Sequence, residues 1–126
     1  MSGAERDLPA GADAIGRIMG LTAQDASDTL TAMYGTDIAS EVLGIGRIWD
    51  RDVLTRRERS LAAVSALVTL GSRDRLRLHV GAALNHGCTR AEIEEVILTL
   101  MVYAGHARAT EGIEVARDVF RERGLL

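Results

Sequence analysis

The stretch TRRERSLAAVSALVTLGSRDRLRLHVGAALNHGCTRAEIEEVILTLMVYAG, residues 55–105, decides the fold class of this chain. It contains two capping boxes, Thr55-Arg56-Arg57-Glu58 and Thr89-Arg90-Ala91-Glu92, in which a hydroxyl and a carboxylate bond the free N–H groups of a first helical turn. Each apolar run that follows ends at a glycine, the residue that most readily terminates a helix. This punctuation predicts three helices, at about residues 55–70, 72–87 (capped by Ser72) and 89–105.

Apolar residues recur every three or four positions in these helices, which is the spacing of one buried face. The predicted core positions are Leu61, Val64, Leu67 and Val68; Leu76, His79, Val80, Ala83 and Leu84; and Ile93, Val96, Ile97, Leu100, Met101 and Ala104. His79 is a histidine within such an apolar face. Because a buried imidazole must find a hydrogen-bond partner or lose stability, it is the most informative single position.

Three further helical patterns flank this stretch, at about residues 22–34, 37–49 and 107–123. Gly44 and Gly46 weaken the second and predict a kink or break there. Their inward or same-side residues are Ala26, Leu30 and Met33 in the first, Ile38, Val42, Ile45 and Trp49 in the second, and Ile113, Ala116, Val119 and Phe120 in the third.

No segment keeps the alternation of a strand, so the sequence predicts an all-α fold. Residues 1–14 mix charged and small side chains with the only proline, Pro9, and predict a flexible lead-in without a signal peptide. Residues 15–126 predict a single helical domain, because 126 residues leave no room for a second one.

Composition narrows the class of protein. Hydrophobic residues make up 47% of the chain and aromatic residues only 3%, so the core must consist of closely packed aliphatic side chains. A net charge of -3 with interleaved signs argues against nucleic-acid binding. The longest apolar stretch, residues 96–107, is too short to cross a membrane. Leu98 and Val102 lie off the buried face of their helix and predict subunit contacts, hence a homo-oligomer.

Cys88 is the only cysteine, which excludes an intramolecular disulfide and a CxxC redox pair and favours a reducing, cytoplasmic location. His86 lies close to it, at the junction of two predicted helices. No HxxxH or CxxC spacing links any two candidate ligands, however, so no metal site is expected.

His79 and Glu58 each have two interpretations. His79 is either a core histidine with a satisfied hydrogen bond or a general acid or base. Glu58 is either a helix-capping carboxylate or, in addition, the group that orients the imidazole of the next helix.

The remaining candidates are also ambiguous. Arg51 and Arg57, in a run with Arg56 and Arg59, could anchor a carboxylate substrate or lie on a solvated face. Trp49 and Tyr103 could line a pocket or fill core.

Six stretches resemble the carboxymuconolactone decarboxylase family in order and spacing. They are RIWDR (47–51), LTRRERSL (54–61), LRLH (76–79), AALNHG (82–87), TRAEIEEV (89–96) and YAG (103–105). The resemblance covers about residues 15–122. It implies an AhpD-like helical bundle assembled as a ring-like oligomer, a trimer or a hexamer, and it assigns functional importance to Glu58 and His79.

The related AhpD-like alkylhydroperoxidases carry a CxxC pair just upstream of this histidine, at positions occupied here by Ser72 and Arg75. Thiol peroxidase chemistry needs a thiolate and a resolving thiol, so this chain is not expected to be a thiol peroxidase.

The chain also departs from the usual pattern of the family. Arg47 stands in place of a Glu, Asp52 and Ala107 in place of prolines, and His106, Arg108 and Glu111 in place of apolar or small residues. These changes would alter the polarity of any pocket formed after Tyr103, and a changed substrate is therefore a second possibility.

The resemblance implies a cofactor-independent carboxy-lyase acting on a 4-carboxymuconolactone-like acidic lactone. The substrate itself can take up the electron pair released with carbon dioxide, so no cofactor is expected. In this interpretation His79 is the proton donor or oxyanion partner, Glu58 orients it, and Arg51 or Arg57 holds a carboxylate. Trp49, Tyr103 and His106 would line the pocket. The alternatives are a tailoring isomerase, cyclase or hydrolase using the same pair on another carbonyl acid, and a non-catalytic oligomeric binding module.

Overall fold

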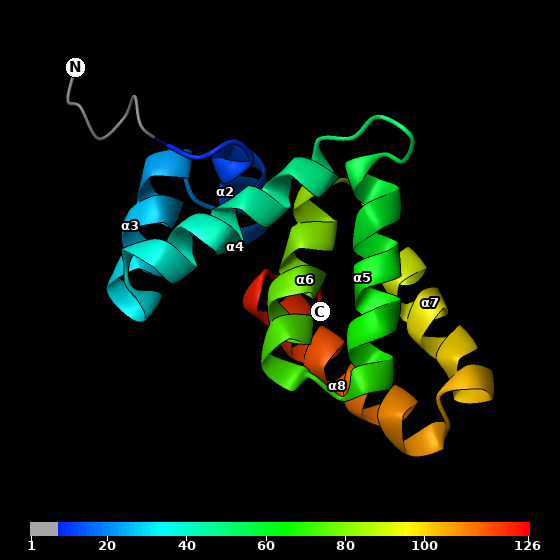
Figure 1. Cartoon of the computed structure of the whole chain (residues 1–126). Helices are drawn as coiled ribbons and strands as arrows, with labels where there is room; N and C mark the ends of the chain where they lie inside the picture. The colour runs from blue at the N-terminus through cyan, green and yellow to red at the C-terminus, as the bar shows by residue number, and fades with distance from the viewer. Residues whose placement is uncertain (1–7) are drawn as a thin grey trace. The chain divides into compact units, whose positions relative to one another are not determined.

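A computed structural model describes residues 8–126, and these residues form seven helices and no strand (Figure 1). The helices are α2 (Ala12–Met19), α3 (Ala23–Tyr34), α4 (Thr36–Trp49), α5 (Arg56–Leu70), α6 (Arg73–Asn85), α7 (Arg90–Tyr103) and α8 (His106–Glu122). The all-α prediction is confirmed. The chain divides into two compact units, a first unit up to Leu54 and a second unit from Thr55 to Leu126.

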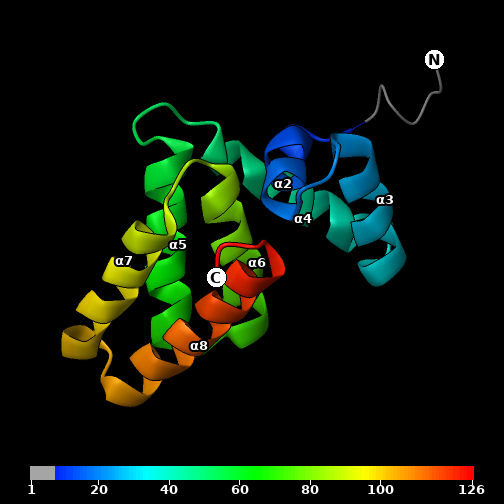
Figure 2. The same ribbon diagram turned by 180° about the vertical axis from the view of Figure 1, so that it is seen from behind.

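The second unit has α5 between α6 and α7, with α8 running across one face of these three helices (Figures 1 and 2). Aliphatic side chains from all four helices form its core, and Phe120 of α8 is completely buried in it. The predicted core positions of α5, α7 and α8 are all buried or partly buried, whereas Leu98 and Val102 are exposed as expected. This unit contains the stretch from which the fold class was predicted.

Both predicted capping boxes are present. The Thr55 hydroxyl accepts the backbone N–H of Glu58, whose carboxylate accepts that of Thr55, and Thr89 and Glu92 repeat this arrangement. Ser72 is the N-cap residue of α6, as predicted, but its side chain makes no capping hydrogen bond. The helix ends at Asn85, two residues before the expected glycine. The sequence therefore predicted all three helix starts, and side-chain capping accounts for two of them.

The first unit consists of α2, α3 and α4, each in contact with the other two. Thr22 caps α3 as predicted, by accepting the backbone N–H of Asp25. The helix α2 was not expected: residues 12–14, part of the predicted lead-in, form its first turn. Residues 1–7 of that lead-in lie outside the described residues.

The buried face of α4 differs from the predicted one. Ala39, Leu43 and Gly46 are its buried residues, whereas Ile38 and Ile45 are more than half exposed. Met33 of α3, expected to point inward, is also exposed. The helix continues through both of its glycines without the predicted break. Close packing explains why α4 buries Gly46 and not its isoleucines: Gly11, at the start of α2, approaches the backbone of α4 at Gly46.

Candidate functional site

The candidate residues are distributed over both units. Trp49 and Arg51 belong to the first unit, whereas Glu58, Arg57, His79, Tyr103 and His106 belong to the second. Within the second unit, the antiparallel course of the helices brings the start of α5, the end of α6 and the start of α7 together at one end, here called the capping end.

Glu58 lies at the capping end in an exposed position. Its carboxylate accepts hydrogen bonds from the backbone N–H and the hydroxyl of Thr55, both at 2.9 Å. These two bonds, the backbone one first, lower the pKa of the Glu58 carboxyl group below its ordinary value. The capping interpretation of Glu58 is therefore realised in the structure, and its second predicted role, orienting His79, stays a prediction.

We expect Glu58→Ala to lower the free energy of unfolding at pH 7 and Glu58→Gln to lower it less, because a glutamine amide can still close the capping box but lacks the charge. The folded-state pKa of Glu58 lies below its unfolded value. Its stabilising contribution is thus complete above the unfolded pKa and is lost as the pH falls through the folded pKa. Urea unfolding of wild type and Glu58→Ala between pH 7 and pH 2 should show the two midpoints converging in acid. A constant difference would contradict this origin.

Arg57 also lies at the capping end, where its guanidinium pairs with Glu92 of α7. Its backbone carbonyl accepts a long hydrogen bond, 3.6 Å, from the Cys88 thiol. Arg57 thus ties the start of α5 to the start of α7. A substrate carboxylate would have to compete with Glu92 for this guanidinium.

Cys88 is buried, with 4% of its surface exposed, and burial raises the pKa of its thiol, an effect that the positive charge of Arg57 partly opposes. Because the thiolate is the reactive form, we expect the folded chain to react slowly with a disulfide reagent such as dithionitrobenzoate at pH 7–8. As urea is added, the labelling of Cys88 should become fast at the unfolding midpoint. Rapid, complete labelling of the folded chain would contradict this prediction.

His79 lies in the middle of α6 and is half-buried. Burial is the largest influence on its pKa, which is lowered below the ordinary value, and the positive charges of His86 and Arg75 lower it further. Its imidazole is therefore mainly neutral at pH 7, and its cation is a stronger acid than an ordinary histidine cation. These are suitable properties for a group that donates a proton in each turnover.

A second imidazole joins this neighbourhood. His86 caps the end of α6, and its Nδ1 lies 2.8 Å from the hydroxyl oxygen of Ser60, a completely buried residue of α5. The sequence indicates His86 only as a possible metal ligand, and it does not single out Ser60. The available signal was the spacing of seven residues from His79, which places both histidines on one face of a helix.

Tyr103 and His106 lie at the opposite end of the second unit. Both are exposed, Tyr103 at the end of α7 and His106 at the start of α8. Glu92, the partner of Arg57, precedes Tyr103 by eleven residues on the same helix, which corresponds to about 16 Å along its axis. The structure therefore does not bring these two predicted pocket residues together with the capping end within one chain.

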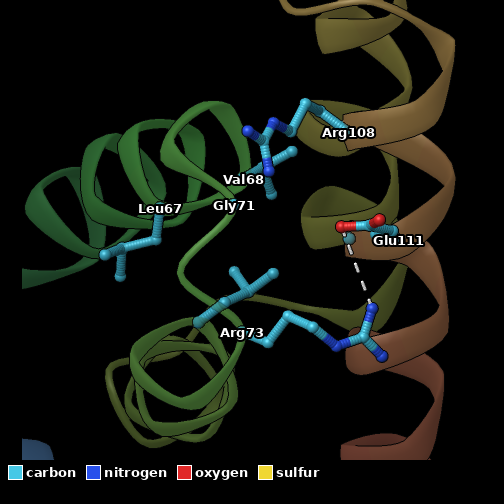
Figure 3. A pocket seen from close by; sticks show the side chains of 8 residues that line it. Leu67, Val68, Gly71, Arg73, Arg108 and Glu111 are labelled. Carbon is cyan, nitrogen blue, oxygen red and sulfur yellow. Dashed lines mark ion pairs between the residues drawn. The ribbon is translucent and has the colours of Figure 1, made fainter.

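A small hollow also occurs at that opposite end, between α5, α6 and α8 (Figure 3). Arg73 reaches Glu111 across it at 3.9 Å, and Arg108 covers Gly71. Leu67, Val68, Leu76 and Gly112 complete its lining. Two of the residues that depart from the family pattern, Arg108 and Glu111, thus make this hollow polar.

Two general findings concern residues 8–126. No three side chains of His, Cys, Asp or Glu are grouped there in a way that could hold a metal ion. None of the helices in that range combines the length and the apolar character that crossing a membrane requires.

Comparisons with known proteins extend this description. The model of the carboxymuconolactone decarboxylase family matches residues 42–118. The chain is 38% identical over 80 residues to a 4-carboxymuconolactone decarboxylase of Acinetobacter baylyi, covering 64% of this chain and 60% of that protein. It is 31% identical over 77 residues to a nitrosuccinic acid decarboxylase of Metarhizium robertsii, covering 61% of this chain and 54% of the relative. The match thus spans little more than half the length of these relatives.

Proposed function

The chain belongs to the carboxymuconolactone decarboxylase family, and on this premise we propose that it is a decarboxylase of a small carboxylated acid, with His79 as its proton donor. The observation that carries the proposal is the half-buried His79, whose pKa is lowered, in a chain similar to two proteins named as decarboxylases. The preferred substrate is a lactone related to 4-carboxymuconolactone.

The chemistry requires one proton and one electron sink. When the bond between the ring carbon and the carboxylate breaks, carbon dioxide leaves and the electron pair moves into the lactone, which becomes an enolate. His79 then gives its proton to the enolate carbon, and water returns a proton to the imidazole. Because the substrate provides the sink, this reaction needs no cofactor. A nitro group beside a carboxylate could accept an electron pair in the same way.

The other candidate residues enter this proposal with smaller roles. Arg51 or Arg57 would hold a second carboxylate, although Arg57 already pairs with Glu92. Trp49 would line the binding region, and Tyr103 and His106 would line it from a neighbouring subunit, because within one chain they lie away from the capping end. Glu58 would orient His79, and Glu58→Gln tests this role, because it removes the charge and keeps the cap. Lower turnover of the folded variant would support the role, whereas full turnover would leave Glu58 as a cap alone.

The proposal is tested by adding the purified chain to 4-carboxymuconolactone and, separately, to nitrosuccinic acid, and measuring carbon dioxide release. We expect catalytic release from the lactone and weaker or no release from the nitro acid. Release of carbon dioxide from the nitro acid alone would show that the preferred substrate is not the lactone but another carboxylated acid. No release from either, by a folded chain, would contradict the proposal and favour a tailoring enzyme or a binding module.

The proposal includes assembly as a trimer or hexamer. Large apolar side chains of the second unit are exposed, among them Leu70 (71%), Leu98 (50%) and Val102 (80%). Exposed apolar surface of this kind is usual at subunit contacts. We expect light scattering to give three or six times the chain mass and Val102→Glu to lower it. A monomeric wild type would contradict this assembly.

A further inference from the structure

We propose that Ser60 and His86 are positioning residues of this site: the Ser60 hydroxyl fixes the His86 ring at the end of α6, and the fixed ring governs when His79 carries its proton. The inference rests on the proposed function for its catalytic consequence. Its physical basis, a coupled pair of imidazoles, can be measured without a substrate.

The first support is the environment of the Ser60–His86 hydrogen bond. Ser60 is completely buried, and the bond, 2.8 Å long, joins residues 26 positions apart in the sequence. A buried hydroxyl that loses its partner costs about 1–3 kcal/mol, so this contact restrains the ring strongly. With Nδ1 engaged by Ser60, the orientation of the His86 imidazole is restricted.

The backbone fixes the position of His86 as well. The helix α6 ends there because Gly87 adopts a positive φ of 95°, and the N–H of Cys88 then bonds the carbonyl of Ala83 at 2.9 Å. This is the usual way for a glycine to terminate a helix. His86 thus lies at the C-terminus of α6, where the helix dipole favours positive charge.

The second support is the register between the two histidines. Seven residues make almost two full helical turns, so His79 and His86 lie on one face of α6, about 10 Å apart along the axis. A charge on His86 lowers the pKa of His79, after the larger effect of burial. At this separation the two rings influence each other through their electric fields and need no direct contact.

Charged groups on the surrounding helices are mostly held in pairs of their own. The ion pairs on α5, α6, α7 and α8 include Arg57 with Glu92, Arg73 with Glu111, Arg77 with Glu122, Arg90 and Arg117 with Glu94, and Arg121 with Asp118. Glu58 is bonded to Thr55, and Arg123 to Asn85. Arg75, on α6 itself, is the other charge that acts on His79, and its guanidinium stays charged over the pH range in which histidines titrate.

The test is a nuclear magnetic resonance titration of the full chain. It has three histidines, and the single variants His79→Gln, His86→Gln and His106→Gln assign their ring signals. In wild type, His79 should titrate below the ordinary range. In His86→Gln, we expect its midpoint to move upward, because one of the two positive neighbours is gone. A midpoint that does not move would overturn the inference, and His86→Asn repeats the test if the first variant misfolds.

Ser60→Ala tests the restraint itself. We expect the Nδ1 and Nε2 nitrogen shifts of His86 to change, because Nδ1 loses its hydrogen-bond partner, and the midpoint of His79 to move. Ser65→Ala, a serine replacement on the same helix, is the matched control and should change neither. Unchanged nitrogen shifts in folded Ser60→Ala would show that the hydroxyl does not hold the ring.

Activity separates this inference from the proposed function. If both hold, Ser60→Ala and His86→Gln should lower kcat several-fold, leave KM nearly unchanged and shift the alkaline limb of the kcat–pH profile with the midpoint of His79. Imidazole coupling without turnover of any tested acid would contradict the proposed function alone. Turnover that depends on His79, without coupling, would contradict the positioning role alone.

Discussion

His79→Ala is expected to lower kcat for decarboxylation by about 10²–10⁴-fold, the usual contribution of a positioned acid or base. The reason is that the enolate left by carbon dioxide must receive a proton at carbon, and His79 is the proposed donor. KM should change much less, because the imidazole acts after the carboxylate has bound. Steady-state carbon dioxide release, with circular dichroism to confirm folding, measures the effect.

Arg77→Ala is the matched control for this variant. Arg77 is an exposed residue of the same helix, and its side chain pairs with Glu122 of α8. We expect turnover close to that of wild type, because surface ion pairs contribute little to stability. If His79→Ala kept full turnover in a folded chain, His79 would be a packed residue, and the proton would have to come from another group or from water.

The pH dependence of wild-type turnover follows from the same residue. The donor is the imidazolium form, whose population falls as the pH rises through the pKa of His79. Burial and the neighbouring positive charges lower this pKa. The midpoint of the alkaline decline in kcat should therefore lie below the ordinary range of histidine pKa values. A decline that begins only above the ordinary range would point to a different proton donor.

The parts of the fold that the sequence predicted depend on neighbours in the chain. The two capping boxes join residues three positions apart, so the letters at positions 55–58 and 89–92 were sufficient. The predicted faces of α7 and α8 were correct because the apolar residues that recur every three or four positions point inward. In these cases local chemistry and tertiary packing favour the same arrangement.

The predictions from the sequence failed where a tertiary contact determines which residues are buried or paired. In α4 the isoleucines form the most apolar stripe, but the helix packs through Ala39, Leu43 and Gly46. The sequence of α4 does not show that Gly11 approaches its backbone at Gly46. The Ser60–His86 contact spans 26 positions, and nothing local to either residue predicts it. Glu58 and His79 were candidates from the sequence pattern, and the resemblance added weight to a functional role for both. The structure explains Glu58 as a capping residue. From the sequence alone, this capping role could not be ranked above a catalytic role.

Gly46→Ala is expected to destabilise the first unit by about 1–3 kcal/mol or more, the usual cost of overpacking a close contact. A Cβ atom at position 46 would overlap the carbonyl oxygen of Gly11 and lie 2.8 Å from the carbonyl carbon. Both are backbone atoms at the start of α2, so neither can move aside as a flexible side chain could. The two helices would have to separate, exposing Leu43 and Ala39 to water.

Gly44→Ala is the matched control, two residues earlier in the same helix. A Cβ atom there would meet nothing within 4 Å, so this variant should gain about 0.5–1 kcal/mol from the lower backbone entropy of the unfolded chain. Trp49, the only tryptophan, ends α4, and its fluorescence during urea unfolding therefore follows this unit. Opposite shifts of the two midpoints would establish that Gly46 is required by helix packing. Similar shifts for both variants would mean that helix propensity alone decides, and that α2 does not pack on α4 as closely as described.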